Sequence, residues 1–371
     1  MKTNKNRIPA RILLFAGWMT LAGCHQGSPT GAPPDFGIVP GKVTEQVRCQ
    51  KHPAFSYAIY LPSGYSSGDS LPVFLAFDPG GSGVRLVTKY KDLAEQYHFI
   101  LIGSNDSRNG QTVDQIEQIA FAMLMEIRNR YATGDGHIYC MGFSGGSRVS
   151  SIIAFYRGGI KGVIGCGAGL PAFGIEPRYR TNYYGLVGNR DFNFLEMVLL
   201  ERQLSEMGYL NSLHVFDGKH AWPPPEEIGS GIRWHLYQAM KEGSIEPDSI
   251  LMAKVLQQTL FDRLTNSAID PKSLEKEKKQ QNSYSEAMKQ QPLPWWRKQV
   301  EKLNQPADSA TSILNQRLLA YCSMLAYTYS AMALQEKNGT ELSRIISIYE
   351  TVDPENEYIP HLKEQLNTLS R

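Results

Sequence analysis

One serine in this sequence lies in a setting that would make it a nucleophile. Residues 142–146 read Gly-Phe-Ser-Gly-Gly, with Ser144 at the centre of a Gly-x-Ser-x-Gly pattern. In this pattern the serine sits on a strained strand-to-helix turn, where side chains at the flanking positions Gly142 and Gly146 would collide. An apolar run at 137–142 predicts the strand. Read alone, the stretch also fits an ordinary turn, so the interpretation depends on partner residues elsewhere.

A serine hydroxyl is a weak nucleophile and needs a general base together with an acid that orients that base. After this motif the partners are expected later in the chain, in the order acid and then histidine. Asp191 follows the predicted strand 184–188, and His220 follows the predicted strand 212–216. We therefore predict Ser144 as nucleophile, His220 as base and Asp191 as orienting acid.

Alternatives remain open for two of these residues. Asp217 also precedes His220, although both leave the same strand and the chain would have to fold back across a short turn. For Asp191 the alternative is a loop aspartate that caps the next helix. For His220 the alternative is an exposed loop histidine. His214 alternates within a predicted strand, which favours a structural role.

Acyl transfer also requires N–H donors for the oxyanion that forms during attack. The backbone of Gly145, directly after the serine, is expected to supply one. The loop that follows the predicted strand 71–77 reads Asp-Pro-Gly-Gly-Ser-Gly and would supply the other through Gly80 or Gly81. The same glycines also fit a tight turn. Three aromatic residues near the predicted site are candidates to line a substrate pocket: Phe143, Phe192 and Trp222.

Segments of strand and helix type alternate from about residue 47 to about residue 240. This alternation predicts an α/β fold with a mostly parallel sheet flanked by helices. The expected strands are 56–61, 71–77, 99–103, 137–142, 162–166, 184–188 and 212–216; the expected helices are 85–98, 113–131, 193–207, one from about 145 and one beyond 223–225.

After residue 243 the strand-like runs end, and helix-forming residues dominate. The region 243–371 is therefore predicted to be a helical C-terminal appendage, with a solvated helix or exposed connector at 272–290 and amphipathic helices at 317–334 and 342–349. The segment 317–368 also resembles a tetratricopeptide helix pair, although any helical hairpin fits. We expect this appendage to pack against the catalytic domain, predicted at 46–242, or to dock a protein partner.

The N-terminus has the pattern of an export signal. Basic residues precede the apolar run 12–21, which is too short for a permanent membrane span. The run ends in Leu-Ala-Gly-Cys, which resembles the lipobox of bacterial lipoproteins. That resemblance implies a signal peptide at 1–23, lipid on Cys24, a flexible tether at 24–45 and a location in the cell envelope. His25 after Cys24 is compatible with the outer membrane of a Gram-negative host. An ordinary signal peptide with a chance cysteine is the alternative.

Composition excludes several function classes. The 371 residues carry a formal net charge of +2 without a concentrated basic stretch, so nucleic acid is not an expected partner. The other four cysteines lack the paired spacing of a zinc site, and Cys140 and Cys166 lie in apolar runs typical of a core. The loop 78–83 has no Gly-Lys-Ser/Thr for phosphate. We expect neither a metal nor a cofactor.

Together these segments resemble the α/β-hydrolase superfamily. They are most similar to the secreted esterase branch that includes polyhydroxybutyrate depolymerase-like and feruloyl or acetylxylan esterase-like proteins. The stretches that carry the likeness are YAIYLPSGY, LPVFLAFDPGG, GSNDSRNG, GFSGGSR, GNRDFN and GKHAWP, all within residues 47–240. Two positions depart from the family pattern: Asp78-Pro79 replaces the usual histidine-glycine, and Lys219 stands where glycine is common.

The resemblance implies a serine esterase that cleaves carboxylic esters through an acyl-enzyme. The stretch 169–183 is short, so we expect no large lid, and an open site would suit a bulky or polymeric ester such as an esterified polysaccharide. A serine peptidase uses the same side chains and is one alternative. The other is a non-catalytic envelope lipoprotein whose helical tail binds a partner.

Overall fold

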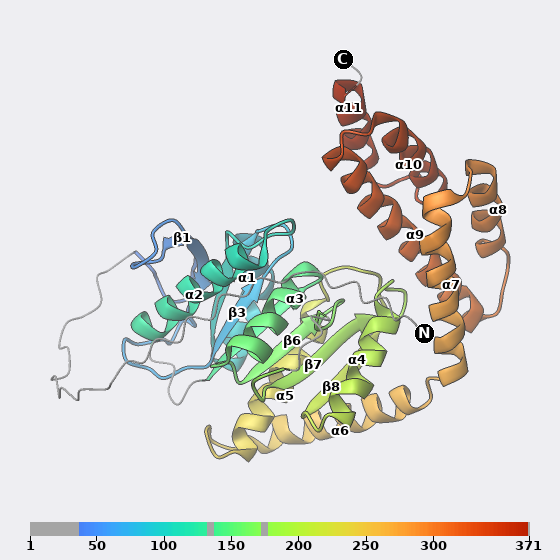
Figure 1. The fold of residues 1–371 in the computed structure, drawn as a ribbon. Coiled ribbons are helices and arrows are strands. Elements are labelled where there is room, and N and C mark those ends of the chain that lie inside the picture. The colour runs from blue at the N-terminus through green and yellow to red at the C-terminus, as the bar shows by residue number, and fades with distance from the viewer. Residues whose placement is uncertain (1–36, 132–136, 172–176, 370–371) are drawn as a thin grey trace, which may run out of the picture. The chain divides into compact units, whose positions relative to one another are not determined.

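An eight-stranded sheet forms the centre of the computed structural model shown in Figure 1. The structure describes residues 37–131, 137–171 and 177–369, all of which belong to one unit, Phe36–Arg371. The signal peptide, the lipobox with Cys24 and most of the tether predicted from the sequence lie outside the described residues. The strands run in the spatial order β1-β2-β4-β3-β5-β6-β7-β8.

Neighbouring strands from β4 to β8 are parallel, whereas β1 and β2 form the antiparallel edge. The central strands are buried on both faces, which explains their continuous apolar sequences. β1 begins at Val43, so residues 43–45, assigned to the tether from the sequence, belong to the sheet. The strands are β1 Val43–Arg48, β2 Ser56–Tyr60, β3 Val73–Phe77, β4 Ile100–Ser104, β5 Ile138–Phe143, β6 Gly162–Cys166, β7 Asn182–Gly188 and β8 Asn211–Phe216.

Helices cover both faces of this sheet, as the sequence predicted. Residues of α2, α3 and α4 share one buried cluster with Val73, Leu75 and Phe77 of β3. Residues of α1, α5 and α6 share the other cluster with Phe74 and Ala76, because successive strand residues point to opposite faces. The helices are α1 Gly83–Tyr97, α2 Val113–Arg130, α3 Gly145–Ile152 followed by the π-helical turn η1 Ile153–Arg157, α4 Phe194–Glu206, α5 Pro225–Lys241 and α6 Ser249–Ser267.

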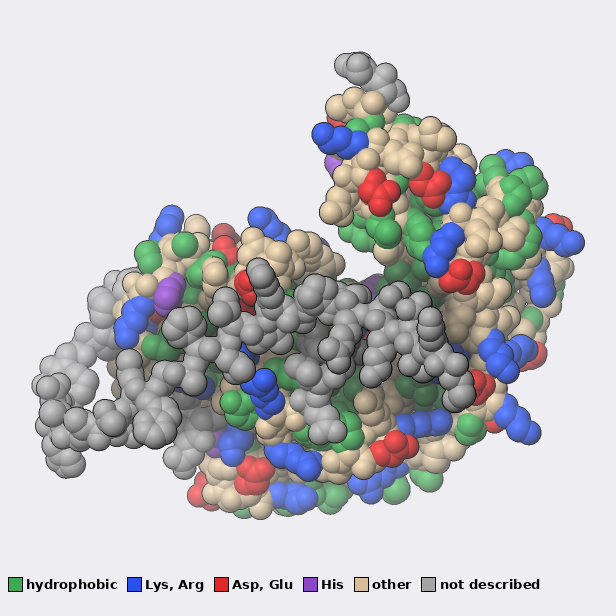
Figure 2. Space-filling model, in the orientation of Figure 1, with side chains coloured by type: hydrophobic (Ala, Val, Ile, Leu, Met, Phe, Trp, Pro, Cys, Tyr) green, Lys and Arg blue, Asp and Glu red, His purple; other side chains and the backbone are tan. Residues whose placement is uncertain are grey.

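The remaining helices have a core of their own. Trp296, Leu318, Ile345 and Ile348 are among its fully buried residues. The segment 272–290, predicted as a solvated helix or an exposed connector, lies in the helix α7, and its Leu274 belongs to the buried cluster that α2, α3 and α4 share with the sheet. On the face in Figure 2, basic and acidic side chains are interspersed along the tail and the lower edge of the molecule. These helices are α7 Pro271–Gln290, α8 Leu293–Leu303, α9 Ser309–Gln335, α10 Gly339–Val352 and α11 Ile359–Leu369.

A buried polar cluster fastens α6 to the sheet. The Nδ1 atom of His214 in β8 lies 2.8 Å from Oδ1 of Asp262 in α6, and its Nε2 lies 2.7 Å from Oε2 of Glu227 in α5. Tyr184 donates to Asp262 from β7. Burial alone would lower the pKa of His214, but its hydrogen bonds to the two carboxylates outweigh that and raise the pKa to about 9. His214 therefore has the structural role predicted from the sequence, as a cation between two anions.

This cluster makes stability depend on pH. The folded-state pKa of His214 lies above its value of about 6.5 in the unfolded chain, so its stabilisation is complete below that pH and is lost as pH rises through about 9. We expect the free energy of unfolding to fall by about 3 kcal/mol from this source between pH 6 and pH 10. Urea titrations across that range measure it. His214→Gln should remove this component, whereas His52→Gln, at a half-buried site beside Phe121, should retain it.

Candidate active site

Ser144 occupies a strained turn between β5 and α3. Its φ of 51° and ψ of −119° are unusual for a residue with a side chain, and the two glycines make room for this conformation. A Cβ atom added to Gly142 would lie 2.2 Å from the carbonyl oxygen of Gly146, and one added to Gly146 would lie 2.0 Å from that of Phe77. Any larger residue at either position would push the strands and helix apart. The Gly-x-Ser-x-Gly pattern thus forms the strained turn predicted from the sequence.

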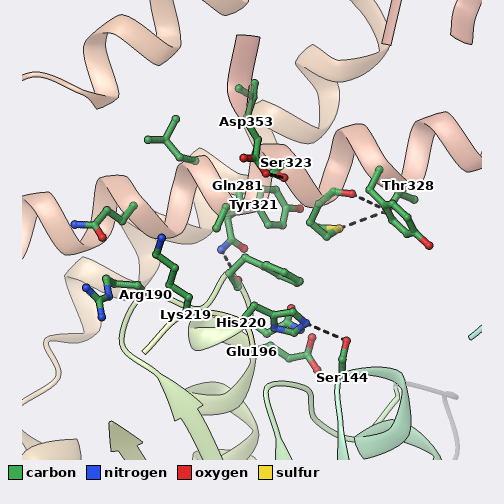
Figure 3. Close-up of a pocket in the computed structure, with 18 of the residues that line it drawn as sticks. Ser144, Arg190, Glu196, Lys219, His220, Gln281, Tyr321, Ser323, Thr328 and Asp353 are labelled. Atoms are coloured by element: carbon green, nitrogen blue, oxygen red, sulfur yellow. Dashed lines mark hydrogen bonds between the residues drawn. The ribbon is translucent and has the colours of Figure 1, made fainter. Parts of the chain in front are cut away.

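The structure brings together the serine, histidine and aspartate that the sequence singled out. His220 Nε2 lies 3.0 Å from Ser144 Oγ, as Figure 3 shows. On the other side of the ring, His220 Nδ1 lies 2.9 Å from both carboxylate oxygens of Asp191. Asp191 is 1% exposed, and the backbone N–H of Asn193 holds its Oδ1 at 2.8 Å. All three side chains follow the carboxyl ends of parallel strands, β5, β7 and β8.

The alternative acid lies elsewhere. Asp217 forms an ion pair with Arg190 at 3.0 Å, and its side chain is 77% exposed. Both Nδ1 contacts of His220 within the described residues go to Asp191. Asp217 is therefore outside the hydrogen-bonded chain that leads to Ser144.

Two of the predicted aromatic residues hold the histidine ring. Phe143 and Phe192 lie on His220 with ring centroids 4.6 and 4.1 Å away. Phe192 also lines the cavity above Ser144. Trp222 packs against Phe143 from the other side, with 5.7 Å between the centroids. These contacts limit the imidazole to one orientation, and Phe143 and Trp222 act behind the ring instead of lining the large cavity.

The loop after β3 is organised by Asp78, which is 1% exposed. Its Oδ1 accepts the N–H of Gly80 at 2.8 Å, and its carbonyl oxygen accepts the N–H of Gly81 at 3.1 Å. Its Oδ2 accepts the indole N–H of Trp222 at 2.7 Å, which ties this loop to the one that carries His220. The N–H groups of Gly80 and Gly81 are thus occupied within the loop. The structure does not present either as a free oxyanion donor, in contrast to the expectation from the sequence.

The N–H of Gly145 is free within the described part of the chain, at the positive end of α3. Beside it lies Asn109, for which no role is predicted from the sequence. A Cβ atom added to Gly145 would lie 1.9 Å from Asn109 Oδ1 and 3.5 Å from its Nδ2, so the side-chain amide covers the backbone of Gly145. The backbone N–H of Asn109 donates to Pro79 at 2.8 Å, which fixes the residue in place. In the sequence, only its place in GSNDSRNG, one of the stretches that carry the family resemblance, drew attention to this residue.

A cavity of about 950 Å³ opens directly over Ser144 and His220. We call it the large cavity. The α/β part of the chain contributes Ser144, Arg148, Arg190, Phe192, Lys219 and His220 among its lining residues. The tail contributes Gln281 of α7, Leu319, Tyr321, Met324 and Tyr327 of α9 and Tyr349 of α10. The expectation of an open site without a large lid is therefore wrong on the side where the tail helices line the cavity.

Contacts around Asp191 explain how the tail reaches the site. Arg317 of α9 forms a bidentate ion pair with Glu277 of α7, at 2.8 and 2.7 Å, and Glu277 is fully buried. The same guanidinium donates to the carbonyl oxygen of Asn189 at 3.0 Å and lies 4.2 Å from the ring centroid of Phe194. These contacts fix α7 and α9 to the loop that carries Asp191.

The described residues contain no cluster of histidine, cysteine, aspartate or glutamate side chains arranged to hold a metal ion. Cys49, Cys140, Cys166 and Cys322 are buried free thiols, with Cys140 and Cys166 in the core as predicted. Burial raises the pKa of Cys49 to about 12, which makes its thiol a poor nucleophile. In the described ranges, every helix is too short or too polar to cross a membrane.

Three features define the fold: the strand order, the helices on both faces of the sheet and the turn at Ser144. This is an α/β-hydrolase-type fold with a helical C-terminal appendage. No family model and no curated protein sequence matches the chain. Similar solved structures include the S-formylglutathione hydrolase of Staphylococcus aureus, with 12% identity, a TM-score of 0.41 and coverage of 49% of this chain and 90% of that one.

Two further similar structures are esterases. One is from Pyrobaculum calidifontis, with 14% identity, a TM-score of 0.41 and coverage of 52% of this chain and 82% of that one. The other is a butyrate-bound esterase from Thermogutta terrifontis, with 14% identity, a TM-score of 0.42 and coverage of 58% and 98%.

The bond between Asp78 and Trp222 can be tested directly. Trp222→Phe should leave one oxygen of a buried carboxylate without its N–H donor and lower the free energy of unfolding by about 1–3 kcal/mol, as measured in urea. Trp295→Phe is the matched control, because Trp295 is also half-buried and its indole N–H makes no hydrogen bond within the described residues. Equal losses in the two variants would show that the bond contributes nothing.

Proposed function

We propose that this chain is a serine hydrolase that cleaves carboxylic esters through an acyl-enzyme. The observation that carries the proposal is the continuous hydrogen-bonded chain from Ser144 Oγ through His220 to the buried carboxylate of Asp191. The strained turn holds the hydroxyl at the floor of the large cavity. An ester in that cavity meets a nucleophile with its base already in place.

In the first half-reaction, Oγ of Ser144 attacks the ester carbonyl carbon while His220 Nε2 takes the hydroxyl proton. Asp191 holds the opposite ring N–H and stabilises the imidazolium that forms. The tetrahedral intermediate then collapses: the bond from carbon to the alcohol oxygen breaks, and that oxygen takes the proton from His220. The alcohol leaves, and the acyl group stays on Ser144 as an ester.

In the second half-reaction, His220 takes a proton from water, and the resulting hydroxide attacks the acyl-enzyme. Collapse returns the proton to Ser144 Oγ and releases the carboxylic acid. In both halves the oxyanion rests on the N–H of Gly145 at the N-terminus of α3. The side-chain amide of Asn109, which lies over Gly145, supplies the second donor in this proposal, because Gly80 and Gly81 are engaged with Asp78.

We further propose that the protein is held in the cell envelope by lipid on Cys24, in the outer membrane if the host is Gram-negative. The supporting observation is the sequence pattern of basic residues, a short apolar run and Leu-Ala-Gly-Cys. A bulky ester, such as an esterified polysaccharide, is the proposed substrate because the large cavity greatly exceeds the volume of a simple short-chain ester.

Removing the Ser144 hydroxyl tests the proposed nucleophile. Ser144→Ala should lower kcat for 4-nitrophenyl acetate by at least about 10⁴-fold and abolish labelling by a fluorophosphonate probe. Ser151→Ala is the matched control, since its hydroxyl is buried in the same helix without a hydrogen-bond partner in the described structure. Ser144-dependent cleavage of a peptide 4-nitroanilide with no ester turnover would favour a peptidase. Absence of both activities and of labelling would favour a non-catalytic lipoprotein.

The proposed oxyanion donor has a separate test. Asn109→Ala should lower kcat for 4-nitrophenyl acetate by about 100-fold with a small change in KM, because the donor acts mainly in the transition state. Asn109→Asp keeps the shape but lacks the N–H group, so its kcat should fall at least as far. If Asn109→Asp keeps most of the activity that Asn109→Ala loses, the donor role is contradicted, and the loss in Asn109→Ala reflects packing alone.

A further inference from the structure

Buried contacts fix which side of α6 faces the sheet. Leu251 and Val255 begin this buried side, and polar side chains continue it. Asp262, which is 2% exposed, lies 2.8 Å from His214 of β8. One turn further on, the side-chain amide of Asn266 donates to a carbonyl oxygen of β8 at 2.8 Å. Because these contacts hold the helix about its own axis, the opposite side of α6 faces away from the sheet.

That opposite side is apolar, unlike the outer side of an ordinary surface helix. Of the large hydrophobic side chains that the described chain exposes, five lie on α6, and they include the four most exposed. Hydrophobic side chains reach the surface beside basic ones along the lower edge in Figure 2, where Figure 1 places α6. A concentrated apolar surface of this kind indicates a binding face. We call it the outer face of α6, and it consists of Ile250, Leu256, Leu260, Phe261 and Leu264.

Basic side chains border the outer face on both flanks. Lys254 and Arg263 are nine positions apart, which is about two and a half helical turns, so they lie on opposite sides of it. Both are exposed, whereas Asp262, the one acidic residue in the sequence of α6, is buried. Between residues 254 and 280 the chain exposes six basic and two acidic side chains, because α7 begins with a run of lysines. An apolar face bordered by cations is typical of a helix that lies in the plane of a membrane surface.

We propose that α6 docks this protein on an anionic phospholipid surface, with the outer face in the headgroup layer and the bordering cations against lipid phosphates. The C-terminal half of α6 enters deepest, since the exposed Glu246 and Asp248 precede its other end. This inference goes beyond the proposed esterase function and does not depend on it. It also differs from lipid on Cys24, because it needs no covalent modification and determines which side of the protein meets the membrane.

The same charges argue against a second copy of this chain as the occupant. Two outer faces packed together would place the cations of both copies in one interface, and α6 has no exposed carboxylate to offset them. A phospholipid surface supplies an apolar layer and a layer of negative phosphates in a single partner. Charge complementarity therefore favours the lipid.

Vesicle binding by a chain without lipid tests the proposal. The chain from residue 24 onward with Cys24→Ser lacks the apolar run 12–21 and the lipid, and it retains the whole unit Phe36–Arg371. It should co-sediment with vesicles of phosphatidylethanolamine and phosphatidylglycerol, and bind phosphatidylcholine vesicles at least about tenfold more weakly. Added salt should weaken the binding to anionic vesicles. Absence of binding to the anionic vesicles overturns the proposal.

Substitutions in this parent chain test the apolar contact. Leu260→Asp/Leu264→Asp should lower the partition coefficient for anionic vesicles at least about 30-fold, because two leucines leave the apolar layer and two anions approach the phosphates. Val113→Asp/Phe121→Asp is the matched control, since both residues are exposed on α2, which covers the other face of the sheet. Equal losses in the two double variants overturn the proposal.

Reversing the bordering charges tests the electrostatic contact. Lys254→Glu/Arg263→Glu should lower the same partition coefficient about tenfold or more. Arg297→Glu/Lys302→Glu makes the same change in net charge at exposed positions on α8 and should have a much smaller effect. Equal effects of the two pairs would show that only the net charge matters and would overturn the role of α6.

A fluorescent label shows which side enters the lipid. The four cysteines of the described chain are buried thiols, so a thiol-reactive, environment-sensitive dye will label an added surface cysteine selectively. On Leu260→Cys its emission should shift to shorter wavelength when anionic vesicles are added, whereas on Phe121→Cys it should not. Equal shifts at the two positions overturn the proposal.

Two further readouts separate the alternatives. Sedimentation velocity of a dimer that Leu260→Asp/Leu264→Asp converts to a monomer, without vesicle binding by either, would assign the outer face to a second copy and overturn the proposal. The α6 variants should keep the parent kcat/KM for 4-nitrophenyl acetate, because no residue of α6 is among those that line the large cavity. Failure of the esterase proposal is distinct: the parent chain would then bind vesicles but show no Ser144-dependent turnover.

Discussion

The close approach of β3, β5 and α3 at Ser144 is the constraint on which the rest of the site depends. The backbone of Gly146 lies so near the carbonyl of Phe77 that a single added carbon would stand 2.0 Å from that oxygen. This contact forces the chain through a turn with positive φ at Ser144 and directs the hydroxyl away from the sheet. Because the strain is stored in the backbone, the neighbouring strands must hold the turn from both sides. Phe77 pairs with Gly142, and Phe143 pairs with Cys166, which provides that support.

Around this turn, the loops that bear the other groups are tied to one another by buried polar contacts. Asp78 connects the loop after β3 to Trp222, two residues beyond His220. Tyr90 of α1 donates to the carbonyl of Pro223 at 2.7 Å and adds a second tie to the same segment. The imidazole of His220 is also in contact with two phenyl rings, those of Phe143 and Phe192. A histidine held in this way needs little reorganisation when it takes a proton, which is the condition for efficient general-base catalysis.

The helical tail extends this preorganisation to the substrate. Arg317 joins a fully buried carboxylate, a carbonyl next to the acid loop and the ring of Phe194 in one set of contacts. A charge pair buried this deeply stabilises only when its hydrogen bonds are complete, and here both carboxylate oxygens of Glu277 are bonded. These contacts of Arg317 therefore hold the tail beside the loop of Asp191. The same helices line the large cavity over Ser144 and His220.

The sequence by itself determined the fold class and the three residues that meet at the turn. Continuous apolar strands, helical periodicity and a glycine-flanked serine are local patterns, and parallel strands bring their carboxyl ends to one edge whatever the details. Tertiary structure alone decided that Asp78 occupies the N–H groups of Gly80 and Gly81, since this depends on where a single side chain turns. It also decided that α9 lines the cavity over Ser144. The apolar residues of α9 are spread around the helix, so its sequence does not show which side meets which partner, and the ion pair of Arg317 with Glu277 joins residues 40 positions apart.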